Sequence, residues 1–124
     1  MKFMMIVKHA EPAIPPTKEL IDAVAKLGEE AAKAGTMIIS GALAPTVAST
    51  RVRVSGGQLK ALDGPFTEAK EVFGGFAIFE LPSKEEAIEG AKRFMELHRT
   101  YCPGWEGETE VRQIFGPEEC APKG

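Results

Sequence analysis

Residues 63–80 have the sequence DGPFTEAKEVFGGFAIFE, a turn followed by a strongly apolar segment. Asp, Gly and Pro form turns because Asp accepts backbone N–H bonds, Gly tolerates unusual φ angles and Pro fixes φ. The apolar run 72–81 predicts a strand, and Gly74-Gly75 permits a bulge or a close backbone approach. Side chains alternate along a strand, so Phe76 and Phe79 point to opposite sides. The strand is therefore apolar on both faces.

The segments on either side predict a β-α-β, hairpin, β-α-β order. Further strands are predicted at 3–7, 37–43 and 108–115, with a hairpin of 50–54 and 59–62 around Ser55-Gly56-Gly57-Gln58. Thr17 is placed to cap one helix that ends at Gly35, and Ser83 with Glu86 forms a capping box for another. This order predicts an α+β fold, a ferredoxin-like βαββαβ unit with an inserted hairpin and both helices on one face.

Residues 1–116 are predicted to form one domain, followed by a flexible tail at 117–124.

In the second strand, Met37 and Ile39 are expected on one face and Ile38 on the other.

The strands are thus apolar on both faces, although two helices can cover only one of them. A bare apolar face of several hundred Å², on the order expected here, is unusual on a monomer. We therefore expect a homodimer in which two sheets pack face to face as a dimeric α/β barrel.

Composition excludes several classes of protein. The chain has 124 residues, with 15 basic and 18 acidic side chains and a net charge of −3, which argues against nucleic-acid binding. The apolar N-terminal run is too short for a membrane span. Cys102 and Cys120 form no CxxC pattern, so no metal site is expected, and free thiols fit a cytoplasmic setting. Gly74-Gly75 does not form a GxGxxG phosphate loop, and no cofactor is expected. The sequence also lacks a nucleophile elbow.

The stretch 63–80 resembles the motif of the DGPF proteins, a branch of the YCII-related superfamily, in the pattern DGPF-T-E-x-K-E-x-x-G-G-F. That family has segments similar to KFMMIVKH at 2–9, SGALAPT at 40–46 and EVRQIF at 110–115. The resemblance implies a ferredoxin-like fold assembled as a dimeric α/β barrel, with a function that is mostly unassigned. In the superfamily a His–Asp pair lining a pocket is linked to catalysis. Some DGPF proteins are linked to extracytoplasmic-function sigma factors.

The resemblance makes Asp63 the candidate pocket acid, whereas its plain interpretation is a turn residue. Its histidine partner stays open. His9 ends the first strand with the parity of Phe3, and either faces a cavity of the sheet or is an ordinary strand-end residue. His98 lies near the C-terminus of the second helix, where the helix dipole and packing also explain it. We expect Asp63 and His98 or His9 to form a catalytic acid–base pair in which the carboxylate orients the imidazole.

Three residues are candidates for substrate binding. Ser40 before Gly41 can present a hydroxyl at a strand end, or the pair can mark a bulge. The family pattern implies that Lys70 binds an anionic group, although a solvated loop lysine fits equally. Arg112 can clamp a substrate carboxylate or pair with a protein carboxylate, Asp63 among the candidates.

Two functions follow as expectations. The first is a cofactor-free enzyme that acts on a small molecule through the Asp–His pair. The alternative is a ligand-sensing or regulatory module associated with an extracytoplasmic-function sigma factor, which rests on the resemblance alone. A barrel kept only for an interaction surface is a third possibility.

Overall fold

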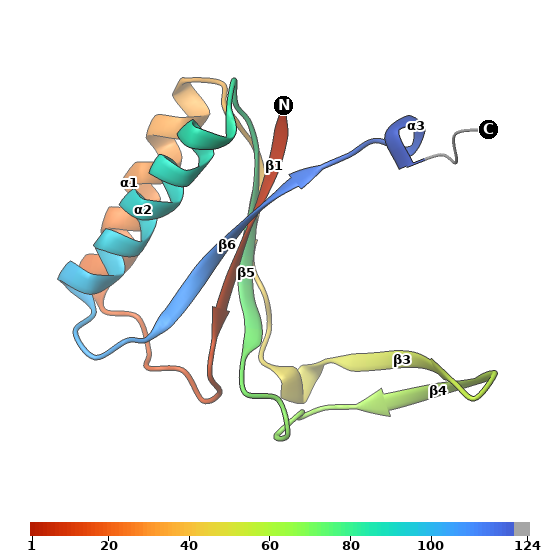
Figure 1. Cartoon of the computed structure of the whole chain (residues 1–124). Helices are drawn as coiled ribbons and strands as arrows, with labels where there is room; N and C mark the ends of the chain where they lie inside the picture. The colour runs from red at the N-terminus through yellow and green to blue at the C-terminus, as the bar shows by residue number, and fades with distance from the viewer. Residues whose placement is uncertain (121–124) are drawn as a thin grey trace.

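The computed structural model describes residues 1–120 as a four-stranded sheet, two long helices and a projecting hairpin (Figure 1). The elements are β1 (Lys2–His9), α1 (Lys18–Lys33), β2 (Met37–Ala42), the 3₁₀ helix η1 (Thr46–Ala48), β3 (Thr50–Ser55), β4 (Gln58–Asp63), β5 (Val72–Glu80), α2 (Lys84–Tyr101), β6 (Gly107–Ile114) and α3 (Pro117–Cys120). The predicted α+β class and element order are confirmed. Of the predicted tail, 117–120 form α3, and 121–124 lie outside the described residues.

The main sheet has the strand order β2-β5-β1-β6, and every neighbouring pair is antiparallel. Both α1 and α2 lie on one face of it (Figure 1). The strands β3 and β4 form a separate two-stranded sheet. Their turn contains Gly56 and Gly57, with φ of 58° and 75°, as a tight hairpin turn requires.

Local capping signals fix where the helices begin. The Thr17 hydroxyl oxygen accepts a hydrogen bond from the backbone N–H of Leu20 at 3.1 Å. Ser83 does the same for Glu86 at 3.2 Å. Each bond satisfies an N–H that has no partner within its helix. Gly35, with φ of 72°, follows the end of α1, so the Thr17 cap and the Gly35 stop are confirmed, and of the capping box the bond to Ser83 is present.

The core lies between the helices and the sheet. On β1, Phe3 and Met5 are buried against Ala87 and Ala91 of α2, and Phe79, Leu81 and Val111 pack around them. Full burial of a Phe side chain contributes about 1.5–3 kcal/mol, so Phe3 is a principal anchor of α2 on the sheet. Phe3 pairs with Phe79 across the strands, which assigns the odd-numbered residues of β1 to the helix face.

A bulge changes the facing of β2. Met37 pairs with Phe79, but Ile39 pairs with Ile78, with a register shift between them. Cross-strand partners share a face, so Met37 faces the helices and Ile39 faces away. The expectation that the two share a face is wrong, because the extra residue in the bulge reverses the alternation.

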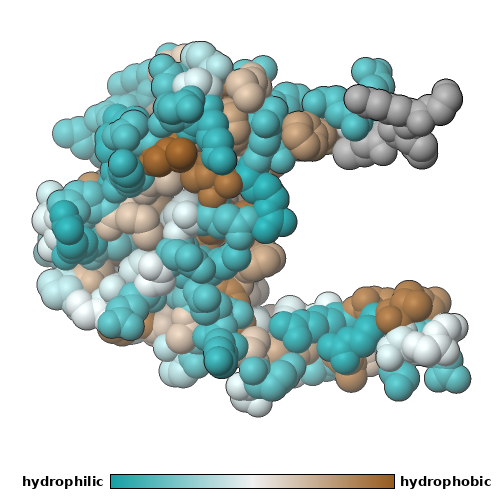
Figure 2. Space-filling view, in the orientation of Figure 1, coloured by the Kyte–Doolittle hydropathy of each residue, from teal (hydrophilic) through white to brown (hydrophobic). Residues whose placement is uncertain are grey.

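The other face of the sheet has no helix from residues 1–120 over it (Figure 1). We call it the open face; it carries Met4, Ile6, Ile39, Phe76 and Ile78. The β3-β4 hairpin and the segment after β6 project from this side, and Figure 2 shows the hollow between them. The expected second apolar face is therefore present.

The hairpin also carries apolar side chains. Val52, Val54 and Leu59 are 74%, 71% and 76% exposed, and Val54 pairs directly with Leu59. We call Val52, Val54 and Leu59 the hairpin stripe. An isolated two-stranded ribbon is marginal in water, so burial of this stripe would stabilise the hairpin.

Candidate functional site

A cavity of about 940 Å³ lies between the two helices and the sheet. Its apolar wall includes Met5, Val7, Leu20, Val24, Leu27 and Phe94. On β5, Gly75 and Ala77 also line it, and their small size leaves space that larger side chains would fill. Clefts of this size and character bind small organic ligands.

Both histidines of the chain line this cavity. His9 ends β1, and His98 lies in the last turn of α2 with 9% of its surface exposed. In each ring Nδ1 lies 2.9 Å from a backbone carbonyl oxygen, that of Ala10 for His9 and that of Phe94 for His98. A carbonyl oxygen only accepts, so Nδ1 carries the hydrogen and the lone pair of the neutral ring is on Nε2. In its neutral form, each imidazole therefore has its acceptor lone pair at Nε2.

An indole ring connects the surroundings of the two histidines. The ring centroid of Trp105 lies 4.5 Å from that of His98, and the Phe94 ring lies 4.7 Å from it. Trp105 also covers Gly107, the cross-strand partner of His9, because a Cβ at Gly107 would lie 2.4 Å from the indole. Glycine at 107 thus lets the indole approach the strand beside His9.

Gly74 makes room for His9 in a similar way. A Cβ at Gly74 would lie 2.1 Å from Nε2 of His9. The register between β1 and β5 shifts between Val7 and Lys8, which leaves Gly74 as the bulged residue. The predicted bulge and close approach at Gly74-Gly75 are both present.

Hydroxyl groups also line the cavity. Ser40 is exposed on β2 opposite Ala77. Thr109 lies on β6 opposite Val7, and its Oγ1 is buried without a hydrogen-bond partner among residues 1–120. The charged lining residues are Glu30, Glu86, Glu89 and Arg93, all exposed. Among the lining residues, the buried polar groups are thus the Thr109 hydroxyl and the His98 imidazole.

Asp63 does not line this cavity. It ends β4, its side chain is exposed, and Oδ1 accepts a hydrogen bond from Thr50 Oγ1 at 2.8 Å across the hairpin. Within residues 1–120 the structure gives no hydrogen bond between Asp63 and either histidine. The contact given for the Asp63 carboxylate is thus this bond across the hairpin, not a backbone N–H bond of a turn.

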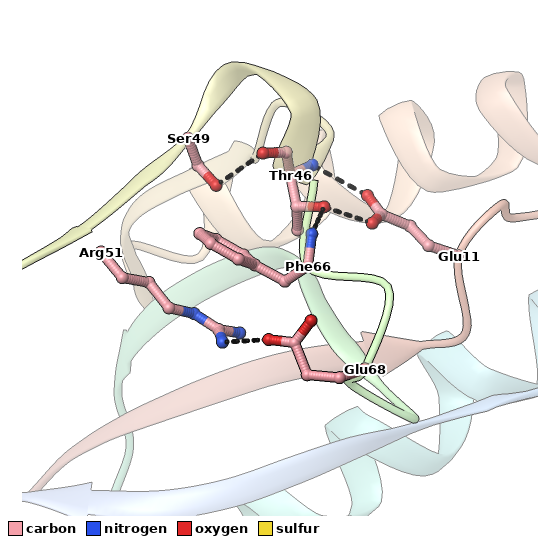
Figure 3. A network of polar contacts seen from close by, with 6 residues as sticks. All are labelled: Glu11, Thr46, Ser49, Arg51, Phe66 and Glu68. Carbon is pink, nitrogen blue, oxygen red and sulfur yellow. Dashed lines mark hydrogen bonds and ion pairs between the residues drawn. The ribbon is translucent and has the colours of Figure 1, made fainter. Parts of the chain in front are cut away.

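The DGPF turn packs against η1 at the base of the hairpin (Figure 3). The N–H of Gly64 donates to the carbonyl of Ser49 at 2.8 Å, and the N–H of Phe66 donates to Thr46 Oγ1 at 3.2 Å. A Cβ at Gly64 would lie 1.6 Å from the carbonyl oxygen of Thr46, so only glycine fits. The buried ring of Phe66 lies under Arg51, whose guanidinium is 3.7 Å from the ring centroid. We call this arrangement the hairpin joint.

Glu11 joins the network from the loop after β1 (Figure 3). Its Oε2 accepts from the backbone N–H of Thr46 at 2.8 Å, and its Oε1 accepts from the Thr46 hydroxyl at 2.5 Å. The bond from the Thr46 hydroxyl and then that from its backbone N–H hold the pKa of Glu11 below its ordinary value, and the protonated form of His9 would lower it further. Sequence reasoning missed Glu11, which lies in a proline-rich loop; the one signal was that Thr46 ends the family-like segment 40–46.

Lys70 and Arg112 also lie outside the cavity. Lys70 is exposed in the loop between β4 and β5. Arg112 lies on the open face opposite Met4, and its Nε donates to Glu110 Oε2 at 2.5 Å. Lys8 Nζ binds the other oxygen of Glu110 at 2.6 Å, and this bond raises the pKa of Lys8 and lowers that of Glu110. Arg112 therefore pairs with a protein carboxylate, and the partner is Glu110. Of the predicted site residues, His9, His98 and Ser40 share the cavity.

Within residues 1–120 no group of three or more His, Cys, Asp or Glu side chains is placed to hold a metal ion. Neither α1 nor α2 combines the length and the apolar character that crossing a membrane demands.

The architecture defines an α+β domain with an antiparallel four-stranded sheet covered by two helices on one face. Residues 1–114 match the model of the YCII-related domain, and the chain belongs to this family. It is 36% identical over 72 residues to the uncharacterized protein R00369 of Rhizobium meliloti (strain 1021). That match covers 58% of this chain and 56% of the relative. The chain thus spans little more than half the length of this curated relative.

Proposed function

We propose that this protein is a cofactor-free enzyme that moves a proton on a small organic molecule bound in the cavity. One observation carries the proposal: both histidines line one cavity, and in the neutral form of each ring the hydrogen bond from Nδ1 to a backbone carbonyl leaves the lone pair on Nε2. A neutral imidazole can remove a proton from a bound molecule at Nε2 and return it to another atom. Such a transfer isomerises the substrate and needs no oxidant or reductant.

His98 is the better base for this step. Its ring is nearly buried and packs against Phe94 and Trp105, so its orientation is fixed before the substrate binds. His9 is partly exposed, which suits it to exchange the proton with water. The predicted Asp63–histidine pair is a separate mechanism, since it requires the Asp63 carboxylate to act on one of these rings.

Proton exchange in D₂O tests the proposal directly. The protein is incubated with a panel of small carbonyl compounds that have acidic C–H groups, and loss of their proton signals is followed by NMR. We expect His98→Gln to slow exchange by about 100-fold or more, the usual contribution of a general base. Asp63→Asn is expected to leave the rate unchanged, whereas a loss equal to that of His98→Gln would favour the Asp–His pair. Compounds that bind without exchange would overturn the enzyme proposal and favour a ligand-sensing module.

The second part of the proposal is that two copies pack through their open faces. Its support is the apolar character of the open face, where Ile39 is 51% exposed although Ile6 is already buried, together with the exposed Val52, Val54 and Leu59 of the hairpin. The projecting hairpin and the segment after β6 leave a hollow in front of the sheet (Figure 2). A second sheet with the same apolar face fits such a hollow, and an isologous contact buries both copies of the surface. The proposed association with a sigma factor stays a prediction from the family resemblance.

A further inference from the structure

We propose that the cavity selects an uncharged organic molecule with a flat, apolar body and one hydrogen-bond donor, such as an aryl alcohol. This inference rests on the proposed function for the location of the site, and it names the chemical class of the ligand.

The donor requirement follows from the two imidazoles. Because Ala10 and Phe94 hold the Nδ1 hydrogens, each neutral ring offers only an acceptor at Nε2. A hydroxyl or N–H group complements this acceptor. A carboxylate carries only acceptor atoms at neutral pH, so it cannot donate to this lone pair.

The apolar body follows from the wall around His98. Phe94 and Trp105 place ring surfaces within 4.7 Å of the imidazole centroid, and aliphatic side chains of β1 and α1 form much of the remaining wall. Aromatic rings favour offset or edge contacts with other flat rings, each of which adds about 0.5–1.5 kcal/mol beyond area burial. A flat ring is therefore the shape that gains most from this wall.

The charge of the lining disfavours an anion. Among the residues that line the cavity, Arg93 is the single Lys or Arg side chain, and three glutamates line it as well. All four are exposed, so their field is screened, but its sign opposes a negative ligand. Lys70 and Arg112, the predicted anion binders, do not line the cavity.

Three probes that share the naphthalene ring separate these requirements: 2-naphthol, 2-methoxynaphthalene without the donor, and 2-naphthoate with a negative charge. Each is titrated into the ¹⁵N-labelled full chain, and the amides of β5 and the Trp105 indole N–H are followed by NMR. We expect 2-naphthol to bind about 3- to 10-fold more tightly than 2-methoxynaphthalene, the effect of one neutral hydrogen bond. The naphthoate should bind most weakly.

Variants locate the acceptor. The flat ring is expected beside Phe94 and Trp105, which makes Nε2 of His98 the acceptor. His98→Phe keeps a ring but removes this Nε2, so the preference for 2-naphthol over 2-methoxynaphthalene should disappear; Lys70→Ala, outside the cavity, should retain it. If His98→Phe does not fold, His98→Gln serves the same comparison. Equal affinities, or tightest binding of the naphthoate, in the wild-type chain would overturn the ligand class while leaving the site in place. If no probe shifts the cavity resonances, the site itself and the proposed function both fail.

Discussion

The carboxylate of Glu11 binds both polar donors of Thr46, its backbone N–H at 2.8 Å and its hydroxyl at 2.5 Å. The same hydroxyl accepts the N–H of Phe66, so one threonine connects the loop after β1 to the DGPF turn. That loop also contributes Ala13 and Ile14 to the cavity wall. The hairpin joint and the edge of the cavity are therefore mechanically linked through Glu11.

Glu11→Gln is expected to lower the melting temperature at neutral pH and to increase hydrogen exchange in the hairpin joint. The amide replaces one acceptor oxygen by a donor that faces a donor of Thr46. In the wild type, the pKa of Glu11 is depressed below its ordinary value of 4.5, so its stabilisation is present above that pH and lost as pH falls through the folded-state pKa. The gap in melting temperature between the two proteins should therefore narrow as the pH falls below 4.5 and through the folded-state pKa of Glu11. Glu29→Gln on the exposed surface of α1 is the control, and a gap that is independent of pH would contradict this account.

Gly64→Ala is expected to destabilise the protein by about 1–3 kcal/mol or more, since overpacked sites of this kind rarely relax fully. The added Cβ would meet the Thr46 carbonyl oxygen at 1.6 Å, and both are backbone-fixed. Gly28→Ala is a matched control with the opposite sign. Its Cβ would lie 3.7 Å from Met37 Cε, an ordinary contact, and alanine within α1 should stabilise by about 0.5–1 kcal/mol. Urea unfolding measures both, and a neutral Gly64→Ala would show that the joint is not tightly packed.

Thr109→Val is expected to stabilise the chain by about 1 kcal/mol, because it removes a buried hydroxyl without a partner and keeps the shape of the side chain. Thr36→Val is the comparison. The Thr36 hydroxyl donates to the carbonyl of Ala31 at 3.2 Å, so its removal should destabilise by about 0.5–1.5 kcal/mol. Thermal unfolding of both variants measures these two changes in stability. A loss of stability in Thr109→Val would mean that the hydroxyl has a partner, such as a bound water.

Local signals in the sequence predicted most of the fold. Thr17 and Ser83 cap the helices, and Gly56-Gly57 turns the hairpin, because each feature depends on residues within one turn of the chain. The bulge in β2 was not predictable in this way. It appears only when β2 is aligned with β5, and no pattern within 37–43 reveals that Ile39 faces away from Met37.

Local sequence patterns also predicted only part of the candidate site. Residue type and parity identified His9 and His98 as candidates, and both line the cavity. The contact of Asp63 was not predictable from local pattern. It depends on the pairing of β3 with β4, which places Thr50 opposite Asp63, so that the Thr50 hydroxyl donates to the Asp63 carboxylate. The contact of Glu11 with Thr46 joins residues 35 positions apart and follows no periodic pattern.

Ile39→Asp should dissociate the proposed homodimer, as measured by sedimentation at micromolar concentration. Ile39 is 51% exposed on the open face, so the change places a charge in the proposed contact at little cost to the fold of one chain. Ile21→Asp is matched to it, since Ile21 is 54% exposed on α1, away from that face, and this variant should remain dimeric. A wild-type chain that sediments as a monomer would contradict the dimer directly. A dimer that survives Ile39→Asp and dissociates with Ile21→Asp would place the contact on the helices instead, and would leave the open face and the hairpin stripe without an assigned cover.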